Sequence, residues 1–172
     1  MTASAPSLDT KTQMVGNHTL MVITDITGYS KFSKDAIDIK SFEFTTGHGN
    51  EGGMGQSLTT GRLALSGVAV VKPADKGTPL IFQALTSNTK IKEVGIFLYR
   101  NGNDGKSENW MTITLSTAVI ANQKFIDPDK EKGGEAVAYE EVTFQAEKLE
   151  ISHNQGKKVA SYQFTSGGSG GA

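Results

Sequence analysis

Runs of alternating apolar and polar residues, rich in Val, Ile, Thr and aromatic side chains, occupy most of the chain between residues 19 and 165. Alternation with period two is typical of β-strands whose two faces differ. Gly, Asn and Asp residues separate the runs, as expected for turns. The pattern therefore predicts strands at Thr19–Ile26, Ile37–Thr45, Arg62–Lys72, Lys92–Arg100, Trp110–Ile120, Tyr139–Ser152 and Lys158–Thr165.

Two of these runs change the face on which their apolar residues lie. Ile37 and Ile39 fall on one parity, and the phenylalanines at 42 and 44 fall on the other. One extra residue near Lys40–Ser41, a β-bulge, would keep all four side chains on the inner face and would bend the strand. The last long run repeats this slip near Glu147–Lys148, and bent strands are what a closed barrel requires.

Turns and one helix complete the predicted architecture. Asn101–Gly105 and Asn154–Gly156 contain residues that tolerate positive φ and predict antiparallel neighbours. Thr78 is expected to cap a helix at Pro79–Ser87 whose apolar face covers one end of the barrel. That face comprises Leu80, Ile81, Ala84 and Leu85. The fold class is thus mainly β, a closed antiparallel β-barrel with one short flanking α-helix.

Composition at the two ends predicts how the chain is divided. Residues 1–18 are expected to form a flexible N-terminal arm, 19–165 a single β-barrel domain, and 166–172, which read SGGSGGA, a flexible linker-like tail. The arm lacks the basic start and apolar stretch of a classical signal peptide, and no run approaches the roughly 18 apolar residues of a membrane helix. No membrane insertion is expected.

Charge and cysteine content exclude several functions. With 17 Lys plus Arg against 18 Asp plus Glu, the net charge is −1, which argues against a nucleic-acid binder. The lysines are scattered and are expected to be solvated. Because there is no Cys, disulfides, thiolate metal sites and cysteine nucleophiles are excluded.

Several short motifs resemble catalytic or cofactor-binding patterns but lack the structural context that the chemistry needs. Gly47–Gly52 spells G-x-G-x-x-G, but more glycines and a strand follow it instead of the helix that would hold a pyrophosphate. Gly102–Ser107, which resembles the end of a phosphate loop, is interpreted as a hairpin turn. No G-x-S-x-G elbow is present.

The histidines and acidic residues do not form a pattern typical of a metal site. His18, His48 and His153 are isolated from one another, and His48 with Glu51 would supply only two ligands. The acidic stretch Asp127–Glu135 lacks the register of a calcium loop. We therefore expect no enzymatic activity, no cofactor and no metal.

One segment is unusual for its glycine content. Five of nine residues are glycine in the loop at 47–55, which suits either an unstructured hairpin tip or an arm that becomes ordered against a partner. The candidate interface residues are Gly47, His48, Gly49, Asn50, Glu51, Gly52, Gly53, Met54 and Gly55.

The order of these elements resembles the Hcp family of type VI secretion tube proteins over roughly residues 19–165. The resemblance rests on a series of short segments rather than on one motif. They are Ser41–Phe44, the Gly-rich loop, Thr60–Arg62, Val71–Lys72 with Asp75, Thr78–Leu80 with Ala84, Glu140–Phe144, Lys148–Ile151 and the closing hairpin Gly156–Phe164. The arm before Thr19 is longer than the family leads one to expect.

The resemblance implies a structural protein that forms hexameric rings stacked into a tube. Such a tube lies inside a contractile sheath in the bacterial cytoplasm, with a VgrG-type spike and a baseplate as further partners. When the sheath contracts, the tube and spike are expelled without a signal peptide, and effectors travel in the tube's lumen. The Gly47–Gly55 loop would then contact a neighbouring subunit or ring. A phage-like tail-tube protein and a monomeric small-ligand or sugar-binding barrel, with Trp110 and the Tyr residues lining its site, remain alternatives.

The residues also predict self-association independently. Strands such as Thr19–Ile26 and Arg62–Lys72 have apolar residues on both parities. A strand of this kind is expected to face a core on one side and another dry surface on the other. We therefore expect oligomers that form through strand edges and the barrel surface.

Overall fold

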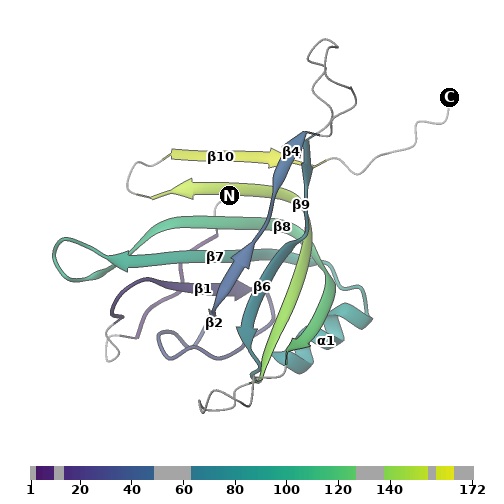
Figure 1. Cartoon of the computed structure of the whole chain (residues 1–172), viewed down its shortest axis with the longest axis horizontal. Coiled ribbons are helices and arrows are strands. Elements are labelled where there is room, and N and C mark those ends of the chain that lie inside the picture. Colours follow the sequence, from purple (N-terminus) through teal and green to yellow (C-terminus); the bar gives the residue numbers. More distant parts are fainter. Residues whose placement is uncertain (1–2, 10–13, 49–62, 127–137, 155–157, 165–172) are drawn as a thin grey trace, which may run out of the picture.

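The computed structural model describes residues 3–9, 14–48, 63–126, 138–154 and 158–164. Figure 1 shows strongly curved strands with one helix at an end of the sheet. The strands are β1 His18–Ile23, β2 Ile37–Ile39, β3 Ser41–Glu43, β4 Thr46–His48, β5 Leu63–Leu65, β6 Val68–Pro73, β7 Ile91–Asn101, β8 Ser107–Ile126, β9 Tyr139–His153 and β10 Lys158–Gln163, and the helix is α1 Thr78–Thr86.

The main sheet closes on itself through one residue. Its strand order is β2-β1-β7-β8-β9-β6-β3, with every pair antiparallel. The two end strands, β2 and β3, are consecutive in the chain and are separated only by Lys40. The Lys40 amide donates to the Val71 carbonyl at 2.8 Å, while Ser41 pairs with the same residue. Two residues thus oppose one, which confirms the predicted bulge and the barrel.

The second predicted β-bulge, near Glu147–Lys148 in β9, is absent, and the change of face there has a different cause. Leu149 is buried in the core as expected, but Ile151 is partly exposed. The offset between β8 and β9 is the same on both sides of Glu147, so β9 has no one-residue bulge there. The change of face coincides with Thr117 on the paired strand, whose φ is +52°. The register shift in this pair lies between Ile120 and Asn122.

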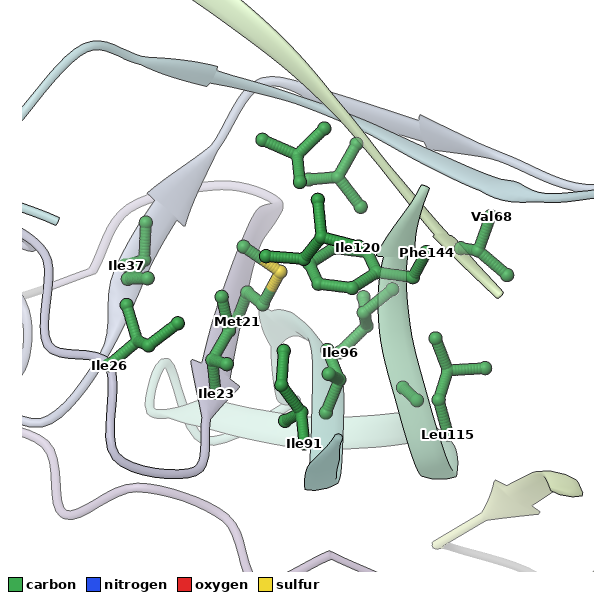
Figure 2. Packing of buried hydrophobic residues seen from close by; sticks show 14 of the residues in the cluster. Met21, Ile23, Ile26, Ile37, Val68, Ile91, Ile96, Leu115, Ile120 and Phe144 are labelled. Atoms are coloured by element: carbon green, nitrogen blue, oxygen red, sulfur yellow. The ribbon is translucent and has the colours of Figure 1, made fainter. Parts of the chain in front are cut away.

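Branched aliphatic side chains fill the barrel (Figure 2). Met21 and Ile96 lie at its centre with Phe144, and each is fully buried. The interior of this barrel is therefore a packed hydrophobic core, and burial of its apolar surface stabilises the fold by roughly 25 cal/mol per Å².

Helix α1 covers one end of the barrel, as expected, although its details differ. Ile81 and Ala84 are buried in the core, whereas Leu80, predicted to lie on the apolar face, is 39% exposed. The N-cap is Gly77 and makes no side-chain capping bond, so the prediction that Thr78 caps the helix was wrong. In the described part of the chain no helix has the length and apolar character needed to cross a membrane.

A second apolar cluster lies on the outer face of β1 and β7. This outer cluster consists of Met14, Leu20, Phe32, Ala36, Phe97 and Tyr99, with Ala3, Leu8 and Val22 packed against it. In the single chain, the second apolar parity of β1 is therefore covered by the chain's own loops and by residues 3–9. Residues 3–9, expected to belong to a flexible arm, lie against the barrel wall.

Candidate assembly surfaces

The sheet extends beyond the closed barrel through β10, which pairs only with β9 among the described strands. Burial falls steadily toward this strand on the core side of the sheet. In one cross-strand row, Leu115 is fully buried, Leu149 is 5% exposed and Tyr162 is 44% exposed. β10 lies at the upper border of the sheet in Figure 1, and its outer edge has no partner strand in the described part of the chain.

Exposed apolar side chains gather on both faces of this extension. Ile151 and Tyr162 lie on the core side, and Val159, which pairs with Ser152, lies on the other face. The rings of Tyr162 and Phe164 meet edge to face at 5.0 Å. An unpaired strand edge that carries apolar side chains is a template for pairing with another chain.

The glycine-rich segment starts inside a strand rather than in a loop. Gly47 and His48 belong to β4, which pairs with β5 in a separate two-stranded sheet and so forms the stem of a hairpin. The remaining candidate residues, from 49 to 55, lie outside the described residues, as does the acidic stretch 127–135.

A buried polar cluster ties the strands to the start of α1, and sequence reasoning missed it. The Lys72 ammonium, fully buried, donates to Glu140 at 2.5 Å, to Asp75 at 3.0 Å and to the Pro73 carbonyl at 2.8 Å. Thr78 donates its hydroxyl proton to Glu140, and Gln123 donates to the other oxygen of the same carboxylate. Lys72 is thus not solvated, contrary to the general expectation for the lysines.

The sequence did contain a signal for this cluster. Lys72 has the same parity as the inward-facing Val68 and Val70, and Glu140 has the parity of Val142 and Phe144. A charged residue at an inward position needs a partner of opposite charge. Because the Glu140 carboxylate on β9 accepts from β6, β8 and the first residue of α1, the cluster fixes these elements to one another.

The other candidate chemistry is dispersed over the molecule. His18 lies beside the Phe32 ring, and His153 lies beside Trp110, with the Arg100 guanidinium 5.5 Å from the centre of the Trp110 ring. Within the described ranges, no three His, Asp or Glu side chains group as metal ligands. Burial raises the pKa of Tyr99, in the outer cluster, to about 12.

Solved structures of Hcp proteins share this architecture. A crystal structure of an Hcp protein superimposes with a TM-score of 0.74 at 18% identity, over 86% of this chain and 99% of that chain. The secreted protein Hcp3 from Pseudomonas aeruginosa gives a TM-score of 0.67 at 19% identity, over 89% of this chain and 100% of that chain. Hcp1 from Salmonella typhimurium gives 0.68 at 16% identity, over 87% and 96%. At these identities the similarity establishes the Hcp fold alone.

Sequence comparison establishes the family. The family model described as "Type VI secretion system effector, Hcp" matches residues 20–153, so the chain belongs to the Hcp family of type VI secretion proteins. The "Major exported protein" of Pseudomonas aeruginosa is 31% identical over 96 residues, which are 55% of this chain and 56% of that protein. The match therefore spans about half the length of that relative. The resemblance drawn from the sequence is confirmed.

Proposed function

We propose that this chain is a structural component of the inner tube of a type VI secretion system. In this proposal, copies form hexameric rings, the rings stack head to tail, and a contractile sheath expels the tube. Family membership supports the general role. The observation that carries the assembly is the β9–β10 extension, whose unpaired edge and exposed Ile151, Val159 and Tyr162 offer a dry surface to a neighbouring copy.

In a ring of identical copies, one surface of each protomer contacts a different surface of the next protomer. Such a heterologous contact forms a closed ring when repeated rotation brings the last copy back to the first, and an open filament when it does not. The β10 edge supplies one half of a lateral contact. We assign the stacking contact to the Gly47–Gly55 segment, because the β4–β5 stem stands apart from the main sheet as a separate hairpin.

The proposed partners and location follow from the same role. Before firing the tube would lie in the bacterial cytoplasm, inside the sheath and beneath a VgrG-type spike, with effectors in the ring lumen. Export would occur through the apparatus itself, and no catalysis or cofactor would be involved. The competing small-ligand barrel is disfavoured because core side chains fill the barrel interior (Figure 2) and because Trp110 packs against Arg100 at the surface.

Two measurements on purified protein test the proposal. Negative-stain images should show rings with an open centre, and light scattering coupled to size exclusion should show a hexamer-sized species. Tyr162→Asp places a charge on the proposed lateral surface and should shift the population toward monomer. Phe82→Asp is the matched control, since Phe82 is also exposed but lies on α1. A parent protein that stays monomeric at all concentrations would refute the proposal.

A further inference from the structure

Residues 3–9, which we call the strap, lie on the outer face of the barrel and belong to no helix or strand. Ala3, Pro6 and Leu8 are half-buried, and the residues between them are exposed. Ala3 and Leu8 pack against the outer cluster of Leu20, Phe97 and Tyr99. The strap thus presents its apolar residues to the barrel as a bound peptide would.

The barrel holds the strap at both ends through backbone amides. The Ala3 amide donates to Thr114 Oγ1 at 3.0 Å, and the Asp9 amide donates to the Phe32 carbonyl at 2.6 Å. Ala3 is seated over Gly95, where an added Cβ would lie 2.9 Å from the Ala3 Cβ. None of these contacts depends on the link between residue 9 and residue 14. The same seat fits the strap of any copy.

The seat lies near the proposed lateral surface. Thr114 pairs with Glu150 on β9, and Glu150 pairs with Ser161 on β10, so two strand spacings separate Thr114 from the unpaired edge. At about 4.8 Å per spacing, the first strand of a copy paired there would be about 14 Å from Thr114. In an exchanged strap the Asp9 amide meets the neighbour's Phe32 carbonyl while Met14 stays in its own outer cluster, so only the five residue steps from Asp9 to Met14 can cross, and these span up to roughly 16–18 Å when extended. Exchange therefore requires that the Asp9 end of the neighbour's seat lie within that distance of Met14.

The strap also lies outside the part of the chain that matches the family, which starts at residue 20. Its apolar contacts are with the outer cluster, whereas the barrel interior forms its own core. The barrel common to the family therefore does not include the strap as one of its strands.

We propose that the seat is an interaction surface between copies of this chain: in the assembled protein the strap of one copy occupies the seat of its neighbour. This inference rests on the proposed self-assembly. The contacts made by a seated strap are the same within one chain and between two chains, so exchange costs little contact energy. In an assembly the neighbouring seat is held at high effective concentration, so the exchanged contact is not lost to dilution. Exchanged straps would fasten adjacent subunits together.

The absence of cysteine in the chain permits a direct test. Full-length Ala3→Cys and full-length Thr114→Cys, carrying different tags, are mixed under assembling conditions and oxidised. Wherever a strap is seated, positions 3 and 114 are adjacent, so a disulfide between the two tagged chains reports exchange. The control pair combines Thr114→Cys with Ser7→Cys, because Ser7 is an exposed residue of the same strap. The Ala3/Thr114 pair should crosslink severalfold more than the control pair.

A double variant, Ala3→Cys with Thr114→Cys in one chain, separates the outcomes. Assembled protein that yields only intrachain disulfides in the double variant, and no interchain product in the mixture, overturns the exchange while leaving the tube proposal standing. Absence of both products overturns the seat itself. Light scattering that shows only monomer, with intrachain disulfides, overturns both the tube proposal and the exchange.

Discussion

Replacing Lys72 by methionine should be among the most damaging single changes to the barrel. The substitution keeps a long side chain but removes the cation that neutralises Glu140 and Asp75. Glu140 is fully buried, like Lys72 itself, so its carboxylate would stay in the interior without an opposite charge. Removing one partner of a buried ion pair costs about 3–5 kcal/mol.

The expected magnitude can be checked by unfolding. For a domain of this size, 1 kcal/mol shifts the melting temperature by about 2–4 °C, so Lys72→Met should lower it by roughly 6–20 °C. Urea unfolding followed by the fluorescence of Trp110, the single tryptophan, gives the free energy directly at concentrations where the protein is monomeric. The control is Lys90→Met, since Lys90 and Glu147 are 4.0 Å apart with side chains 75% and 50% exposed. An exposed pair of this kind contributes less than about 1 kcal/mol.

The double variant Lys72→Met/Glu140→Met tests the reasoning itself. If the damage comes from an unpaired buried charge, removing Glu140 as well should restore part of the stability, because two apolar side chains replace the ion pair. The two single changes would then be less than additive in the double-mutant cycle. Strict additivity, or a loss below about 1 kcal/mol for Lys72→Met, would show that the pair is effectively hydrated and that the argument from burial is wrong.

Three further predictions concern other parts of the chain. Because the pKa of Tyr99 is raised from 10.0 to about 12, the folded state keeps a proton that the unfolded chain loses, and the free energy of unfolding should fall as pH rises from 10.0 toward about 12. In urea unfolding at several pH values, Tyr99→Phe should not show this part of the fall. Gly28→Ala would place a Cβ 2.6 Å from Ile37 Cγ1 and 2.7 Å from Asp75 Oδ2, so it should cost about 1–3 kcal/mol by the same assay. Shortening the Gly47–Gly55 segment to a four-residue turn should leave the melting temperature nearly unchanged and allow rings, but should prevent tube growth in electron micrographs. Long tubes with a melting temperature several degrees lower would contradict the assignment of this segment to the stacking contact.

The strands and the closure of the barrel could be predicted because both leave a local pattern. Alternation locates most strands to within about three residues, and the parity change at Lys40 indicates the bend through which β2 becomes β3. It missed β4, Thr46–His48, and the last six residues of β8, which ends at Ile126 rather than Ile120. The run at 62–72 was less well resolved, since it divides into β5 and β6 around Ser66–Gly67. The apolar residues change parity there, from Leu63 and Leu65 to Val68 and Val70, so the pattern did contain a sign of the break.

Features that depend on contacts between distant residues were harder to predict. Nothing in the composition of residues 1–18 indicates that Ala3 meets Gly95 and Thr114, residues about a hundred positions away. A Ser/Thr/Ala-rich segment is typical of a disordered arm, and its docking depends on a shaped seat formed by other strands. Lys72 is an intermediate case, because its inward parity was visible but its partner could be identified only from the β6–β9 register.

The filled barrel constrains how a tube made from this chain could carry cargo. Fully buried side chains such as Met21, Ile96 and Phe144 occupy the protomer's interior, so nothing of protein size can pass through a single barrel (Figure 2). In the proposed tube, any lumen must therefore lie between protomers and be lined by their outer surfaces. Cargo binding then exists only where a ring has closed. A variant such as Tyr162→Asp that blocks ring closure should lose cargo retention to the same extent, whereas a variant defective only in stacking should keep cargo in isolated rings.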